Sequence, residues 1–184
     1  SAAYNTPMAV RINGALDKQA LQAAFDALVA RHESLRTVFV EEQGVPYLKV
    51  LPSAQVTLTE AFIGALHGKA LEQRLQEHTQ QPFDLATGPL LRLDLLQVGP
   101  QEHLLLLNLH HIASDGWSMS VMVRECIASY NARVSGQPLP ALAPLTVQYA
   151  DYATWQRERL DEGQMHAQLG YWRAQLEDDF SVLE

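Results

Sequence analysis

The stretch GPLLRLDLLQVGPQEHLLLLNLHH, from Gly88 to His111, decides the fold that this sequence encodes. Between Leu91 and Leu95, leucines alternate with polar residues, as they do in a strand that buries one face. Gly99-Pro100 is a turn signal, and an apolar run from His103 to Leu109 follows it. The pattern predicts an antiparallel β-hairpin whose second strand ends at two adjacent histidines.

Helical and strand patterns surround this hairpin in mixed order. Asp17 is a predicted N-cap for an amphipathic helix over residues 18–32. Further patterns predict a strand over 8–16 and two strands within 34–52 around a turn near Gln43-Gly44. Two more helices are predicted, over 66–81, ended by Pro82, and over 118–134, closed by Gly136. A proline-rich connection over 136–155 and helical sequence over 150–177, with a break at Gly163, complete the chain. Since the order lacks a regular βαβ alternation, we expect an α+β fold with a mixed β-sheet flanked by helices.

The composition argues against several classes of function. Asp and Glu outnumber Lys and Arg by 21 to 13, and the resulting net charge of −8 repels the phosphates of nucleic acids. No segment approaches the ~20 apolar residues of a membrane helix, and no secretory signal is visible. The single cysteine, Cys126, fits a reducing compartment and is expected to be a core thiol. These features predict a cytoplasmic protein that binds neither nucleic acid nor membrane.

The segment HHIASDGWS, residues 110–118, carries the candidate chemistry. If the strand continues to its end, alternation places His110 and His111 on opposite faces, so they are a poor metal pair. No cysteine or third histidine lies at zinc-like spacing, and we therefore expect no metal site. His111 lies where a side chain can reach out of the sheet, and a neutral imidazole accepts protons at cellular pH.

On geometry alone, the residues after the histidines can have either a catalytic or a purely structural role. Asp115 binds an arginine, orients His111, or simply caps the following helix. Gly116 permits close backbone approach or a positive φ, and its N–H lies where a helix leaves donors unpaired. A histidine at a strand end and an aspartate before a helix are most often structural, so this spacing alone does not establish catalysis.

Four segments together resemble the condensation domains of nonribosomal peptide synthetases, in the chloramphenicol acetyltransferase-like superfamily. HHIASDG fits the HHxxxDG signature of that family. RHESLRTVF (31–39) and YADYATWQRER (149–159) are similar to its second and fourth core motifs, and QPFDLATGPLLRLDLL resembles the segment before the histidine strand. The motifs occur in the family's order and cover nearly the whole chain.

The resemblance implies half of a two-lobed domain. Family members are V-shaped, with the active site between two similar lobes, and are about twice this length. Residues 1–184 resemble the N-terminal lobe, whereas the first core motif and the C-terminal lobe are expected to be absent. An isolated lobe is therefore expected to be inactive and to expose an apolar face.

The implied reaction is amide bond formation. A donor acyl or peptidyl thioester on one carrier protein is attacked by the amine of an aminoacyl thioester on a second carrier. The resemblance thus implies upstream and downstream carrier protein domains, an adjacent adenylation domain and the C-terminal lobe as partners. No cofactor is expected to bind directly, since the carriers deliver the phosphopantetheine arms.

The resemblance also assigns roles to residues of the motifs. His111 acts as a general base or positions the amine, and Gly116 steadies the oxyanion through its N–H. Asp115 pairs with an arginine, with Arg31 preferred over Arg36, and His110 is structural. The residues expected to line the channel are Trp117, Ser118 and Tyr149, and Ser118 is a weaker candidate for a second oxyanion donor.

Three alternatives to condensation remain. A related acyltransferase with the same motif forms esters, and an epimerisation domain shares the signature but differs after the glycine, where DGWS favours condensation. A degenerate domain only recruits partners and typically loses the second histidine or the aspartate, both of which are present here. The amino acids joined, the product and the oligomeric state do not follow from the sequence, and an L-configured donor is only weakly favoured.

Overall fold

The computed structural model describes residues 2–64, 68–160, 163 and 165–176. The chain divides into two compact units, Ser1–Leu145 and Thr146–Glu184. The first unit contains the sheets and the histidine motif, and the second contains the last two helices.

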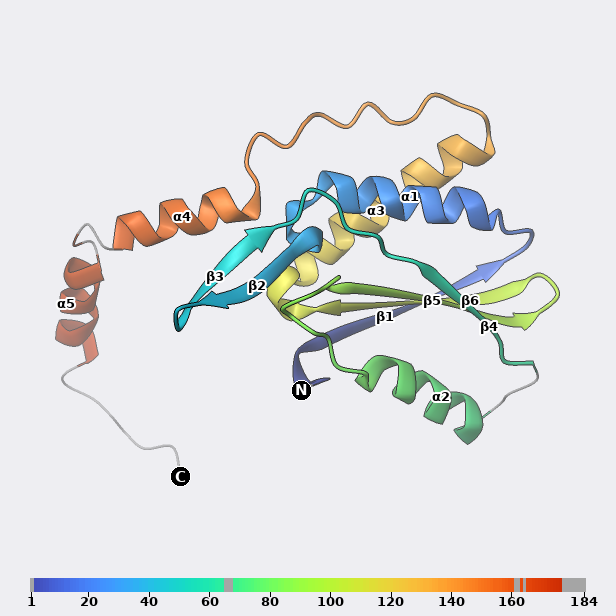
Figure 1. The fold of residues 1–184 in the computed structure, drawn as a ribbon, viewed down its shortest axis with the longest axis horizontal. Helices are drawn as coiled ribbons and strands as arrows, with labels where there is room; N and C mark the ends of the chain where they lie inside the picture. Colours follow the sequence, from blue (N-terminus) through green and yellow to red (C-terminus); the bar gives the residue numbers. More distant parts are fainter. Residues whose placement is uncertain (1, 65–67, 161–162, 164, 177–184) are drawn as a thin grey trace. The chain divides into compact units, whose positions relative to one another are not determined.

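A four-stranded mixed sheet forms the centre of the first unit, in the order β1-β6-β5-β4 (Figure 1). Its strands are β1 (Asn5–Asn13), β4 (Leu58–Phe62), β5 (Leu91–Gly99) and β6 (Glu102–His110). The predicted hairpin is confirmed, since β5 pairs antiparallel with β6 and the chain turns at Pro100-Gln101. β1 pairs antiparallel with β6, and β4, which the sequence analysis missed, pairs parallel with β5.

Helices cover both faces of this sheet. Helices α1 (Lys18–Arg31) and α3 (Gly116–Val134) pack on one face, and α2 (Lys69–Gln80) covers the other (Figure 1). Asp17 caps α1 as predicted, because its side chain accepts the N–H of Ala20 at 2.9 Å. Three short 3-10 turns complete the unit: η1 (Ala2–Tyr4), η2 (Glu33–Arg36) and η3 (His111–Ala113). The expectation of an α+β fold with a mixed, helix-flanked sheet is confirmed.

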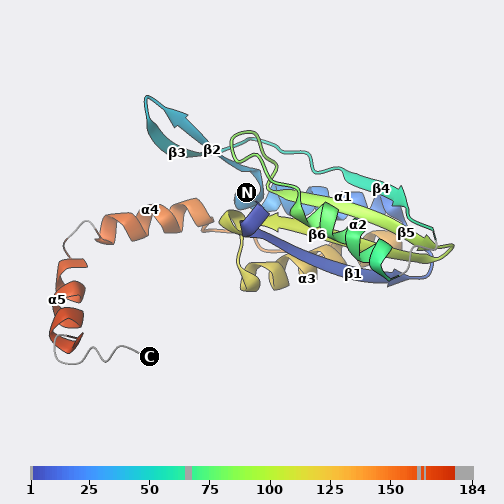
Figure 2. The ribbon, with the colours of Figure 1, turned by 90° about the horizontal axis from the view of Figure 1, so that it is seen from below.

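A separate hairpin follows η2. Strands β2 (Thr37–Glu42) and β3 (Val45–Val50) pair antiparallel, and Figure 2 shows them apart from the four-stranded sheet. Gln43 and Gly44 form the predicted turn, with φ of 53° and 79°. Two successive positive φ values give a turn whose twist matches that of the strands.

Alternation along β5 and β6 divides the core into two parts. Leu93 and Leu107 lie on the face that packs against α1 and α3, together with Phe25 and Met122 from those helices. Leu106 lies on the opposite face, with the partly buried leucines of α2. Because the central strands β5 and β6 are buried on both faces, the sheet holds the end of β6 in a fixed place.

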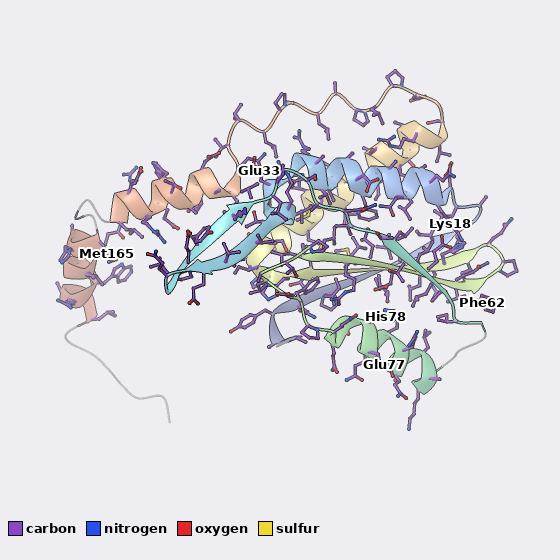
Figure 3. All side chains as sticks on the ribbon, in the orientation of Figure 1. Lys18, Glu33, Phe62, Glu77, His78 and Met165 are labelled. Atoms are coloured by element: carbon purple, nitrogen blue, oxygen red, sulfur yellow. The ribbon has the colours of Figure 1, made fainter. Side chains whose placement is uncertain are left out.

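Polar contacts attach the C-terminal end of α2 to the sheet near the end of β6. His78 of α2, labelled in Figure 3, lies with Nδ1 3.2 Å from Oδ2 of the buried Asp94. Asn108 of β6 and Asn5 of β1 each donate to the carbonyl of Thr79, at 3.0 and 2.8 Å. These contacts satisfy the last carbonyls of α2, which have no partner within the helix.

The second unit contains α4 (Tyr149–Arg159) and α5 (Met165–Leu176). The predicted break between two helical segments is confirmed at Gly163, whose φ is 88°. The predicted proline-rich connection ends earlier than expected, since α4 starts at Tyr149. Asp151 accepts the N–H of Gln148 at 2.8 Å and so caps this helix. None of the helices in the described ranges combines the length and apolar character needed to cross a bilayer.

Candidate active site at the end of strand β6

His110, the last residue of β6, is a buried structural element of the site. Its ring Nδ1 accepts the backbone N–H of Ile112 at 3.1 Å, and its backbone N–H donates to the carbonyl of Leu90 at 3.0 Å. Its ring lies between those of Tyr4 and Phe83, with centroids 6.1 and 6.0 Å away. These contacts fix the direction in which the chain leaves the sheet.

We expect His110 to stay neutral in the folded protein. Burial, together with the neighbouring His111, lowers the pKa of His110, and Nδ1 must be unprotonated to accept the N–H of Ile112. The folded state therefore binds fewer protons than the unfolded one just below pH 6.5. This residue's contribution to stability is lost as the pH falls from about 6.5 to the folded pKa. NMR titration of the His110 ring should give an apparent pKa below about 6.5, and a value above it would contradict this environment.

His111 differs from His110 in its exposure and in its hydrogen bonding. β6 ends at His110, so the strand alternation that would place the two histidines on opposite faces stops before His111. His111 instead begins η3, where its side chain is exposed. Among the residues that the structure describes, no hydrogen bond involves its ring, so the imidazole is available to a substrate.

Asp115 is the N-cap of α3. Its Oδ1 accepts the N–H of Ser118 at 2.8 Å and the Ser118 hydroxyl at 2.7 Å. The hydrogen bond from the Ser118 N–H, and then that from its hydroxyl, lower the pKa of the Asp115 carboxyl. The hydroxyl proton of Ser118, a candidate oxyanion donor, is already donated to Asp115 in this structure.

Gly116 is the first residue of α3, two residues earlier than the predicted start of this helix. Its N–H is one of the first four of the helix, which have no partner inside it. Of the two possibilities open for Gly116, the positive φ is not found, and within this unit no close approach is found either, because a Cβ placed here meets no atom within 4 Å. The first unit alone therefore does not require glycine at this position.

The predicted ion pair between Asp115 and Arg31 or Arg36 is wrong for this structure. Arg31 Nε instead lies 3.2 Å from Oε1 of Glu125 in the middle of α3. Its Nη1 donates to the carbonyl of Ala143 at 2.7 Å. Arg36 donates to the carbonyl of Leu51 at 2.6 Å and lies 3.5 Å from Glu33. Asp115 finds its donors three residues away, and a local cap needs no distant arginine.

Replacing Asp115 tests the cap directly. We expect Asp115→Ala to lower Tm by a few degrees, because α3 loses its N-cap, whereas Asp115→Asn keeps an acceptor and costs less. The cap contributes above the unfolded carboxyl pKa of about 3.9 and is lost as the pH falls through the lower folded pKa. Thermal unfolding followed by circular dichroism checks both variants. An equal loss in Asn and Ala variants would indicate an ion pair instead of a cap.

Glu125 is a supporting residue that the sequence reasoning missed. Its Oε2 lies 2.7 Å from His32 Nε2, and its Oε1 contacts Arg31, so one carboxylate joins the end of α1 to α3. All three side chains are less than 20% exposed, with values of 14, 16 and 19%. Residues 31 and 125 lie too far apart in sequence for any local pattern to reveal the contact.

The residues expected to line the channel lie on two different helices. Trp117 in the first turn of α3 is 79% exposed, and Tyr149 is the first residue of α4 in the second unit. Their lining role stays a prediction. In the described part of the chain, no three side chains of His, Cys, Asp or Glu gather in a way that would hold a metal ion.

Comparison with known proteins identifies the family. The family model of the condensation domain matches residues 1–184. This chain belongs to the condensation domain family. It is 44% identical over 183 residues to a dimodular nonribosomal peptide synthase of Bacillus subtilis (strain 168), covering 97% of this chain and 8% of that protein. The condensation sequence thus spans a small part of the curated relatives it matches.

Solved structures agree with this assignment. The X-domain from teicoplanin biosynthesis, solved in complex with OxyB, is 35% identical, with a TM-score of 0.84 over 99% of this chain and 40% of that chain. The starter condensation domain of the rhizomide synthetase gives a TM-score of 0.85 at 18% identity, over 100% of this chain and 45% of that chain. The second similarity supports the fold alone.

Proposed function

We propose that this condensation sequence is one lobe of a domain that catalyses peptide bond formation in nonribosomal peptide synthesis. The acceptor amine attacks the carbonyl carbon of the donor thioester, a C–N bond forms and the C–S bond breaks. The amine loses one proton, and the departing thiolate of the phosphopantetheine arm takes one up. The observation that carries the proposal is the exposed His111 beside the N-terminus of α3, on a backbone fixed by the buried His110.

The residues divide into three roles. His111 accepts the proton of the amine or holds the amine in place, and it has no competing partner within the described ranges. Gly116 offers a backbone N–H to the developing oxyanion at the start of α3. Asp115 and His110 support these groups by fixing the chain around them, and Arg31 joins α1 to α3 through Glu125.

Partners follow from the same reaction. Upstream and downstream carrier protein domains bring the two thioesters on phosphopantetheine arms, and an adenylation domain loads them. A second lobe completes the channel that Trp117 and Ser118 line.

Reconstitution tests the proposal. The complete two-lobed domain is mixed with a donor-loaded and an acceptor-loaded carrier protein, and the carrier-bound product is measured by mass spectrometry. We expect a dipeptidyl thioester on the acceptor carrier. An acceptor whose amine is acetylated is the matched control, since it lacks a nucleophile and should give no product. A folded domain that forms no amide with matched donors and acceptors would overturn the proposal.

The 184-residue chain alone is expected to form no product in the same assay. Its candidate catalytic groups are exposed, and exposed groups neither exclude water nor hold two arms in line. The complete domain, assayed in parallel, is the positive control. Turnover by the isolated chain would contradict this expectation.

A recruiting role is the second candidate. The X-domain, which is 35% identical to this chain, was solved in complex with OxyB. The presence of both His111 and Asp115 argues for catalysis over recruitment. If reconstitution fails although the carriers bind, recruitment becomes the better explanation.

A further inference from the structure

The first unit contains an apolar cavity that none of the candidate catalytic residues lines. Its volume is about 250 Å³, and it lies between α3, α1 and the strands β1, β5 and β6. Val10 and Leu107 line it from the sheet, Phe25 from α1, and Met122 and Cys126 from α3. Because α3 forms one wall of the cavity, its contents bear on the helix that Asp115 caps.

The lining selects for a neutral occupant. No Asp, Glu, Lys or Arg side chain lines the cavity, so a charged molecule would lose its hydration without gaining a partner. Tyr130 lines one end, and its hydroxyl accepts the N–H of Asp17 at 3.2 Å. The polar side chains that line the cavity, Tyr130 and Asn131, are therefore uncharged.

The size and the access of the cavity also define the occupant. Apolar cavities of about 150 Å³ stay dry and take up benzene, so 250 Å³ holds a larger group such as a fused ring pair. Ile127, which lines the cavity, is 53% exposed, and the cavity therefore reaches the surface along α3. A small molecule can enter there without unfolding of the sheet.

We infer that this cavity is a binding site for a small, neutral, apolar molecule of the size of indole, separate from the acyl-transfer site. Binding replaces an empty space with van der Waals contacts to α1, α3 and the sheet, which stabilises their packing. The inference does not depend on the proposed reaction, because it concerns only the packing of the first unit.

Indole is the first probe. Thermal unfolding of the 184-residue chain at an indole concentration about 100-fold above its Kd should show a rise in Tm of about 5–10 °C. Indole-3-carboxylate has the same ring with a charge and is expected to leave Tm unchanged. No shift with indole, or an equal shift with the carboxylate, would overturn the inference.

A second measurement locates the bound probe. Cys126 is the chain's single cysteine, so methylthiolation by methyl methanethiosulfonate reports on the cavity wall alone. Burial raises the pKa of the Cys126 thiol to about 11, so little thiolate is present and the reaction is slow even with the cavity empty. Saturating indole should slow it at least about tenfold, in proportion to occupancy. An unchanged rate would exclude binding at this place.

A pair of variants distinguishes binding of indole in the cavity from stabilisation by indole bound elsewhere. Met122→Trp fills the space and should abolish the response of Tm to indole. Leu106→Met alters the opposite face of the sheet with little change in volume and should keep it. If Met122→Trp does not fold, the labelling of Cys126 in the unaltered chain still decides. A response retained by folded Met122→Trp would overturn the inference.

Discussion

Replacing His111 by alanine in the complete condensation domain is expected to lower the rate of amide formation by about 10²–10⁴-fold. The free energy of unfolding should change little, because the His111 side chain is exposed and, within the described ranges, makes no hydrogen bond. The measurement is the initial rate of dipeptidyl thioester formation at saturating carriers, with urea unfolding in parallel.

Two histidine variants are the controls for this result. His166→Ala changes an exposed histidine of α5 and should leave both rate and stability unchanged. His110→Ala removes a buried ring and the acceptor of the Ile112 N–H, so it should lower stability as well as rate. A His111 variant that retains more than about a tenth of the rate would not fit a proton-transfer role.

The kinetic parameters distinguish the two roles left open for His111. If the imidazole accepts the proton only in the transition state, kcat falls and the KM for the acceptor carrier stays constant. If it mainly positions the amine, that KM rises as well. Because both results reduce kcat/KM, only the separate parameters decide.

Glu125→Ala is expected to lower the free energy of unfolding by about 3 kcal/mol, because it removes the carboxylate that joins Arg31 and His32 to α3. For a chain of this length the loss corresponds to a fall in Tm of about 6–12 °C. The cost is high because the three side chains are largely buried, so water replaces the lost carboxylate poorly. Urea unfolding provides the measurement.

An exposed ion pair on the same lobe is the matched control. Glu102 pairs with Arg11, but these side chains are 41 and 65% exposed, so Glu102→Ala should cost less than about 1 kcal/mol. Glu125→Gln keeps an acceptor for one donor and should fall between the two. Equal losses of unfolding free energy in Glu125→Ala and Glu102→Ala would mean that the contact between α1 and α3 stabilises the protein no more than an exposed ion pair does.

Patterns within one element were predicted well. The hairpin of β5 and β6, the Asp17 cap of α1, the Gln43-Gly44 turn and the break at Gly163 all depend on residues a few positions apart. Backbone preferences and alternating burial act over such distances, and a single sequence therefore contains them.

Contacts between elements were predicted poorly. β4 was missed because a short edge strand pairs parallel with a partner more than 30 positions away, and its sequence has weak alternation. The arginine assigned to Asp115 binds Glu125 instead, while Asp115 caps its own helix. Both errors concern which distant groups meet, which is decided by how the helices pack.

The sequence by itself determined the family, the α+β class and the location of the candidate site, because the histidine motif ends a strongly patterned strand. Only the tertiary structure decided that His110 is buried while His111 is exposed, that Glu125 joins α1 to α3, and that α3 lies over an apolar cavity. The reason is physical: local preferences fix each element, but side-chain partners and empty space arise only when elements distant in sequence pack together.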